Sequence, residues 1–134
     1  MDFTLTPFVP IADRVWRAVA EPASINIGLV AGASGCVVID TGSTPAQGRQ
    51  IRDAAGAVAG VPVVAAVVTH HHVDHAYGLA AFDDLPTYAH ASVWASICSA
   101  PTLDEELTEL GMTRDDLRRA NHELQLVAAI DLGD

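Results

Sequence analysis

The sequence has 134 residues, of which half are apolar, and a formal net charge of −10 at pH 7. This size and apolar content predict a single folded domain and argue against a disordered chain. Because the chain contains no lysine and only seven arginines, we expect neither nucleic acid nor an anionic membrane as a partner. The acidic residues after residue 100 are predicted to lie on solvated helix faces: Asp104, Glu105, Glu106, Glu109, Asp115 and Asp116.

Residue patterns predict regular elements along nearly the whole chain. Alternating or continuous apolar runs predict strands at residues 3–9, 15–20, 25–31, 36–40, 63–68, 87–90 and 124–132. Helical spacing predicts helices at residues 45–59, 76–82, 91–99, 103–110 and 113–120. Thr44 and Pro45 are typical of a helix start, and Thr113 with Asp116 resembles a capping box.

The predicted helix at 45–59 connects two apolar strands, 36–40 and 63–68. A strand, helix and strand in this order are expected to form a parallel pair with a right-handed crossover. The carboxyl ends of both strands then meet at one edge of the sheet. Asp40 and the histidines that begin at His70 should therefore lie side by side, where open α/β sheets bind their ligands.

Residues 69–78, Thr-His-His-His-Val-Asp-His-Ala-Tyr-Gly, carry the strongest functional signal. His70, His72, Asp74 and His75 form the pattern His-x-His-x-Asp-His. In an extended segment side chains two apart point the same way, so His70 and His72 can bind one ion while Asp74 and His75 reach a second. Such donors suit zinc, and iron or manganese are also compatible. The alternative interpretation is a solvated histidine-rich turn.

This pattern after an apolar strand resembles the signature of the metallo-β-lactamase fold superfamily. Residues 35–42, which end in Asp-Thr-Gly, are similar to a second motif of that family. The resemblance implies an α/β (α+β) fold, a four-layer αβ/βα sandwich with mixed sheets and helices. Members are mostly hydrolases of β-lactams, thioesters, lactones, phosphodiesters and other bonds. One departure is Tyr77, where the family often has glycine.

Carried over residue by residue, the resemblance implies that His70 and His72 bind a first Zn²⁺ and that Asp74 and His75 bind a second. Asp40 would lie beside the site as an outer carboxylate, and Asp74 would also orient the nucleophile and handle its proton. The implied reaction is hydrolysis in which zinc-bound hydroxide attacks a carbonyl or phosphoryl centre of a small-molecule substrate. Residues 101–122 would correspond to a segment that often shapes the substrate pocket.

The resemblance covers residues 1–134 but implies only the first half of the family fold, truncated before its second half. That second half usually supplies a third histidine, a bridging carboxylate and a last histidine. Two further hypotheses therefore stay open. The chain is a catalytically incomplete half-domain that binds metal weakly and associates with itself, as a homodimer, or with a partner chain through an exposed apolar sheet face. Or it is a module that stores or senses metal.

The remaining histidines and cysteines carry weaker signals. His71, His90 and His122 are predicted to have packing or surface roles, because none continues the ligand pattern. Cys36 and Cys98 are predicted to be buried thiols and are too few for a disulfide framework. Neither a secretory signal nor a membrane-spanning apolar segment is evident, which predicts a cytoplasmic location.

Overall fold

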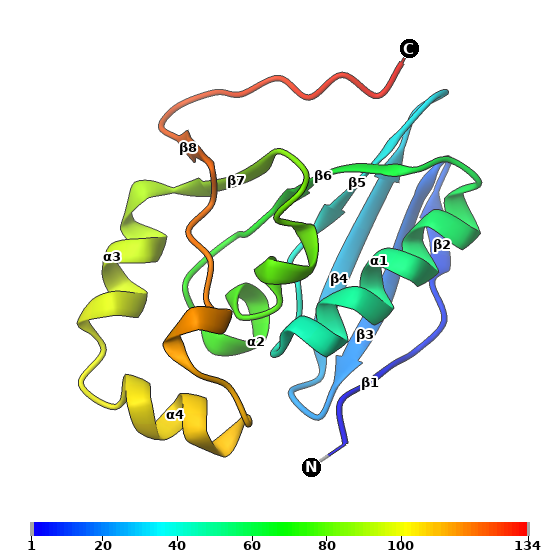
Figure 1. Cartoon of the computed structure of the whole chain (residues 1–134). Coiled ribbons are helices and arrows are strands. Elements are labelled where there is room, and N and C mark those ends of the chain that lie inside the picture. Colours follow the sequence, from blue (N-terminus) through cyan, green and yellow to red (C-terminus); the bar gives the residue numbers. More distant parts are fainter. Residues whose placement is uncertain (1, 134) are drawn as a thin grey trace.

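The computed structural model describes residues 2–133 (Figure 1). Eight strands of this part of the chain form one sheet: β1 (Thr4–Leu5), β2 (Val9–Ala12), β3 (Val15–Glu21), β4 (Ile25–Ala31), β5 (Cys36–Ile39), β6 (Val63–Val67), β7 (Thr87–His90) and β8 (His122–Leu124). The helical elements are α1 (Pro45–Ala59), α2 (Val73–Ala76), α3 (Ala91–Ser99) and α4 (Leu103–Glu109), with the 3₁₀ turns η1 (Leu79–Phe82) and η2 (Arg114–Asp116). The predicted combination of a mixed sheet and helices is confirmed.

The sheet runs in the order β1-β3-β4-β5-β6-β7-β8, and β2 also pairs with β3. Neighbours from β3 to β5 are antiparallel, and neighbours from β5 to β8 are parallel. The predicted parallel pair is present, with Val38 opposite Ala66 and Ile39 opposite Val67. The ends of β5 and β6 therefore meet at one edge of the sheet, as the crossover argument requires.

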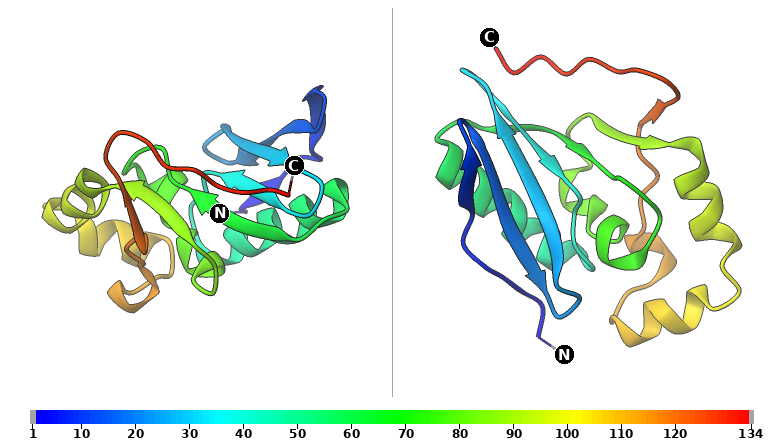
Figure 2. Two further views of the ribbon diagram at one scale, coloured as in Figure 1. Left: turned by 90° about the horizontal axis from the view of Figure 1, so that it is seen from above. Right: turned by 180° about the vertical axis from the view of Figure 1, so that it is seen from behind.

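Helix α1 covers one face of the sheet (Figure 2). It begins after Thr44, whose side chain accepts a hydrogen bond from the Gln47 amide, and it ends at Gly60 in the left-handed conformation (φ 71°). Ile51 of α1 is fully buried, and so are Ile27 and Leu29 of β4. Burying a side chain of this size stabilises the fold by roughly 1.5–3 kcal/mol relative to leaving it exposed.

The opposite face of the central strands is apolar but only half-buried. Register pairs Val30 with Val37 and Gly28 with Ile39 on this face, and Val30 and Ile39 are both partly exposed. Figure 2 shows no helix of the described residues over this side of β3, β4 and β5. The fold therefore leaves one side of its sheet open.

Two predictions about the last third of the chain are wrong. The capping box of Thr113 and Asp116 is present, but the turn η2 stops after three residues and Leu117 is extended (φ −81°, ψ 146°). The chain must extend here because it runs on to pair β8 with β7, and this tertiary pairing overrides a weak local helix preference.

The predicted strand at 124–132 is absent beyond Leu124, so it is also a wrong prediction. Residues 125–133 have no regular structure and run back across the sheet toward the turn between β4 and β5 (Figure 1). There the carbonyl of Leu132 accepts a hydrogen bond of 3.0 Å from the Ser34 amide. A strand needs a continuous partner, and in the described part of the chain β8 finds one for only three residues.

Two smaller corrections concern the first predicted strand and the exposure of one cysteine. The first predicted strand is divided into β1 and β2, because Pro7 lies between them and has no amide hydrogen for the ladder. Cys98 is exposed, whereas Cys36 is buried as predicted. Cys98 is exposed because α3 turns Val93 and Ile97 toward the core instead.

Within residues 2–133, no helix combines the length and apolarity that a membrane span requires.

Candidate metal centre

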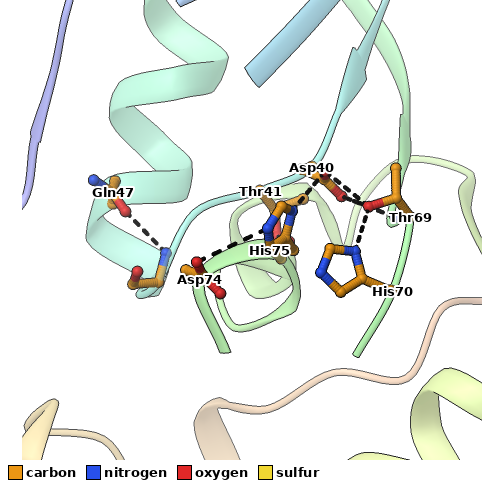
Figure 3. A network of polar contacts seen from close by, with 8 residues as sticks. Asp40, Thr41, Gln47, Thr69, His70, Asp74 and His75 are labelled. Carbon is orange, nitrogen blue, oxygen red and sulfur yellow. Dashed lines mark hydrogen bonds and ion pairs between the residues drawn. The ribbon is translucent and has the colours of Figure 1, made fainter. Parts of the chain in front are cut away.

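The carboxylate of Asp40 organises the edge of the sheet where the ligand motif lies (Figure 3). Asp40 directly follows β5, is 4% exposed and has a positive φ of 71°, a conformation in which aspartate is one of the more tolerated residues. It accepts hydrogen bonds from the Thr69 amide (2.8 Å) and hydroxyl (2.9 Å) and faces His75 Nδ1 at 2.7 Å. One carboxylate thus joins the ends of β5 and β6 to α2.

The residue after Asp40 holds the backbone of the motif. The Thr41 amide and hydroxyl both donate to the carbonyl of His75, at 2.9 and 2.8 Å. The Gly78 amide donates to the Gly42 carbonyl at 3.2 Å. A Cβ on Gly78 would lie 1.8 Å from the Thr41 carbonyl oxygen, so only glycine allows this close approach.

These hydrogen bonds determine which ring nitrogen is left to bind a metal. A carboxylate only accepts, so His75 must donate to Asp40 from Nδ1. The Thr69 hydroxyl uses its single hydrogen on Asp40, so His70 must donate from its own Nδ1 to Thr69 Oγ1, at 2.8 Å. Each neutral ring then carries its lone pair on Nε2. Metal-binding histidines are usually oriented by such a partner on the other nitrogen.

The predicted ligands lie next to one another. The ring centroid of His70 lies 4.0 Å from that of His75 and 4.7 Å from that of His72. The Oδ2 atom of Asp74 lies 3.9 Å from His75 Nε2. Burial and the neighbouring rings of His75 and His72 lower the pKa of His70, which favours the neutral form that a ligand needs.

The side chains of His70, His72, Asp74 and His75 do not converge on one point. Across residues 2–133, no group of three or more histidine, cysteine, aspartate or glutamate side chains is arranged to hold a metal ion. His70 and His75 are oriented by Thr69 and Asp40, whereas His72 is exposed and can change rotamer without disturbing the core. Imidazole and carboxylate are donor types that zinc accepts, and two of the four residues, His70 and His75, already have an oriented ring.

The other histidines lie outside this network. His71 is exposed, and its ring contacts His72 at 4.9 Å. His90 caps α3, where its side chain accepts a hydrogen bond from the Ser92 amide. His122 is exposed on β8, and its ring lies 4.8 Å from that of Tyr88.

A cavity of about 590 Å³ opens beside the motif. Its lining includes Glu106 of α4 and five residues of the motif: His71, His72, Val73, Asp74 and Tyr77. Tyr77 is 3% exposed, and its hydroxyl donates to Glu106 Oε2 at 3.4 Å. Burial, followed by the charge of Glu106, raises the pKa of Tyr77 to about 12, so its hydroxyl remains a donor at neutral pH.

Sequence reasoning assigned no role to two residues of this region. Thr69 was part of the motif, but its link to Asp40 depends on strand pairing. Glu106 was predicted to be solvated with its acidic neighbours, and it is instead half-buried. Its position three residues after the buried Leu103 is the helical spacing that could have placed it on the inner face of α4.

Comparison with known proteins gives a family match that includes both motifs, residues 35–42 and 69–78. The sequence profile of the metallo-beta-lactamase superfamily matches residues 20–128. The chain belongs to the metallo-β-lactamase superfamily. This membership confirms the family inferred from residues 35–42 and 69–78, and it identifies the fold as one of metal-dependent hydrolases. No curated protein matches the chain.

Solved metallo-β-lactamase structures share this fold. One from Erythrobacter litoralis, with beta mercaptoethanol in its active site, is 29% identical, with a TM-score of 0.63 over 90% of this chain and 50% of that one. FIM-1 from Pseudomonas aeruginosa, in a mono-zinc form, is 23% identical, with a TM-score of 0.65 over 96% of this chain and 53% of that one. A metallo-β-lactamase from Hirschia baltica is 21% identical, with a TM-score of 0.64 over 96% and 54%. The chain thus spans about half the length of these proteins.

Proposed function

We propose that this domain is a zinc-dependent hydrolase of small molecules, in which His70, His72, Asp74 and His75 bind the metal and Asp40 positions His75. By analogy with the superfamily, a complete site would hold two ions. The reacting group would be a carbonyl or phosphoryl centre. When bound, zinc would polarise that group and supply hydroxide at neutral pH by lowering the pKa of its water ligand to about 7.

The chain's own residues would contribute orientation and proton handling. Asp40 and Thr69 keep the protons of His75 and His70 on Nδ1, so that both Nε2 atoms remain available as ligands. Asp74 lines the cavity. There its carboxylate would orient the attacking nucleophile and accept its proton.

One observation carries this proposal. The carboxylate of Asp40 is buried and accepts hydrogen bonds from His75, a predicted ligand, and from Thr69, which orients a second predicted ligand, His70. A solvated histidine-rich turn would have no need of a buried acceptor that selects one tautomer of each ring. The arrangement therefore supports a metal site over the turn interpretation.

The test is zinc content after dialysis, measured by elemental analysis, for the full chain and two matched variants. His72→Ala removes a proposed ligand, and His71→Ala removes its exposed neighbour. We expect bound zinc in the unmodified chain and in His71→Ala, and at least a tenfold weaker affinity in His72→Ala, as is typical when a metal site is damaged. A chain that retains no zinc, or equal losses in both variants, would contradict the proposal.

A second candidate function is supported by the open face of the sheet. Val30 and Ile39 are partly exposed there, and an extended apolar patch favours association. In this alternative the domain is a catalytically incomplete half that binds metal weakly and forms a homodimer through that face.

Sedimentation velocity distinguishes this alternative. It requires a dimer in the unmodified chain and a monomer in Val30→Asp. The control is Val58→Asp, on the outer surface of α1 where Val58 is 41% exposed, which should leave the dimer intact. A monomer at all concentrations, or a dimer that persists in Val30→Asp, would exclude association through this face.

A further inference from the structure

The cavity beside the ligand motif has an unusual charge distribution. Its walls come from the motif, from the C-terminal end of α3 and from α4. Asp74 and Glu106 supply two carboxylates, and no arginine lies in the lining. The chain has no lysine, so the basic side chains of the lining are those of His71 and His72, which belong to the motif and not to the wall formed by Glu106. The volume of about 590 Å³ is in the range of small-molecule sites.

Glu106 is held in place by neutral groups alone. Tyr77 donates to its Oε2 at 3.4 Å and Thr102 donates to its Oε1 at 3.2 Å. Among residues 2–133, no arginine or histidine forms an ion pair with it, although two other acids of the last third, Asp104 and Glu123, do have arginine partners. Its negative charge is therefore oriented by hydroxyls but not neutralised.

Tyr77 determines where that charge lies. Tyr77 is buried and lines the cavity, so its hydroxyl is a rigid donor. Hydrogen bonds from two sides limit the rotamers of Glu106 and keep its carboxylate at the cavity wall. Preorganisation of this kind lowers the ordering cost when a charged partner binds.

We propose that Glu106, positioned by Tyr77, makes this cavity select substrates that carry a protonated amine and disfavour substrates that carry a carboxylate or phosphate. The inference rests on the proposed function for the place of hydrolysis, and it adds the class of substrate. A half-buried carboxylate without a counter-ion attracts an ammonium group and repels an anion across the same few ångströms.

The experiment uses the full chain, without added metal, and two probes of similar size. 2-Phenylethylamine is cationic at pH 7, and 3-phenylpropanoate is anionic. Binding is followed by chemical-shift changes of the backbone amides of residues 77, 99, 100 and 102–106 in ¹H–¹⁵N spectra. We expect the amine to bind about tenfold more tightly than the carboxylate, and the preference to weaken as salt is added.

Three variants locate the source of the preference. Glu106→Gln keeps the shape of the side chain and should weaken amine binding by about fivefold to tenfold. Glu105→Gln makes the same charge change at an exposed neighbour and should change it by less than about twofold. Tyr77→Phe keeps the ring and removes the hydroxyl, so it should give an intermediate loss. Rescue of amine binding by Glu106→Asp would further show that charge, not shape, is responsible.

The outcomes separate this inference from the proposed function. Equal binding of both probes, or a preference that survives Glu106→Gln, would overturn the inference even if the chain binds zinc. A preserved amine preference in a chain that binds no zinc would leave the inference standing and remove the proposed function. In zinc-loaded protein, Glu106→Gln should lower kcat/KM for an ester with an amine more than for its carboxylate counterpart, because the bound metal is the same in both enzymes and only the Glu106 charge differs.

Discussion

The rim, meaning the sheet edge formed by Asp40 and residues 69–78, and the segment after β8, residues 125–133, differ strongly in burial and in backbone pairing. At the rim, Asp40 is 4% exposed and is hydrogen-bonded to residues 29 and 35 positions away. After β8, residues 125–133 have no regular structure, and Leu126 and Val127 are 97% and 89% exposed. Both regions have clear sequence patterns, one of ligands and one of apolar residues.

The difference lies in where each region finds its partners. The rim obtains hydrogen-bond acceptors and packing from β5, β6 and the loop after β5, which are all within the described chain. The apolar segment after β8 has no neighbouring strand for most of its length in the described part of the chain. An apolar pattern therefore becomes a strand only where a partner for its backbone is available.

The largest effect should come from crowding the rim. In Gly78→Ala, the added Cβ would lie 1.8 Å from the Thr41 carbonyl oxygen and 2.9 Å from that of Thr44. The loop after β5 would have to move, and we expect a loss of about 3–5 kcal/mol in the free energy of unfolding. Urea denaturation followed by circular dichroism measures this loss.

Gly56→Ala is the matched control, because Gly56 lies inside α1 and its added Cβ would have no neighbour closer than 4.0 Å. This variant should gain about 0.5–1 kcal/mol from higher helix propensity. Similar midpoints for both alanine variants would show that the contact between Gly78 and Thr41 is not a constraint.

The next effect should come from the buried acceptor at the rim. Asp40→Ala leaves the Thr69 amide and His75 Nδ1 without their partner, which should cost about 2–4 kcal/mol and weaken zinc binding by about 10–100-fold. Asp40→Asn tolerates the positive φ and keeps one acceptor, so it should lose less stability. Unfolding and competitive zinc titration measure the two losses, and an unchanged zinc affinity in Asp40→Ala would separate this carboxylate from the metal site.

A smaller effect should come from the ion pair between Arg52 of α1 and Asp84, which links α1 to the turn after η1. Hydrogen bonding to Arg52 lowers the pKa of Asp84 below its ordinary value of 3.8. The stabilisation is therefore complete above that value and disappears as pH falls through the lower pKa of the folded state.

We expect Asp84→Asn to cost no more than about 1 kcal/mol at neutral pH, because the Asp84 side chain is 62% exposed and solvent screens the pair. Unfolding curves of both proteins should converge when the pH is lowered past the titration of Asp84. A difference that grows on acidification would contradict the sign of this shift.

The smallest effect should come from the segment after β8. Replacing both Leu126 and Val127 by serine removes apolar groups that are 97% and 89% exposed, so the free energy of unfolding should change by less than about 0.5 kcal/mol. Amide hydrogen exchange in this segment should be fast in both proteins. A loss above about 1 kcal/mol would mean that these side chains are buried in solution, and the contrast with the rim would disappear.

Much of the fold followed from local pattern. The ends of α1, the pairing of β5 with β6 and the meeting of Asp40 with the histidine motif all follow from periodicity, capping residues and crossover handedness. The predicted helix at 113–120 failed because the chain there is extended to reach β7. The predicted burial of Cys98 failed because a helix of nine residues offers more than one face, and its packing selected Val93 and Ile97.

By itself, the sequence determined the identity and order of the ligand candidates, the family and the edge of the sheet where the motif lies. These properties depend on spacings of a few residues and on the handedness of the chain. Only the tertiary structure decided that Thr69 links His70 to Asp40, and that Tyr77 holds Glu106 at a cavity. The reason is physical: proton positions and unpaired charges depend on hydrogen bonds between residues about thirty positions apart, and no local pattern specifies which distant atom will be the partner.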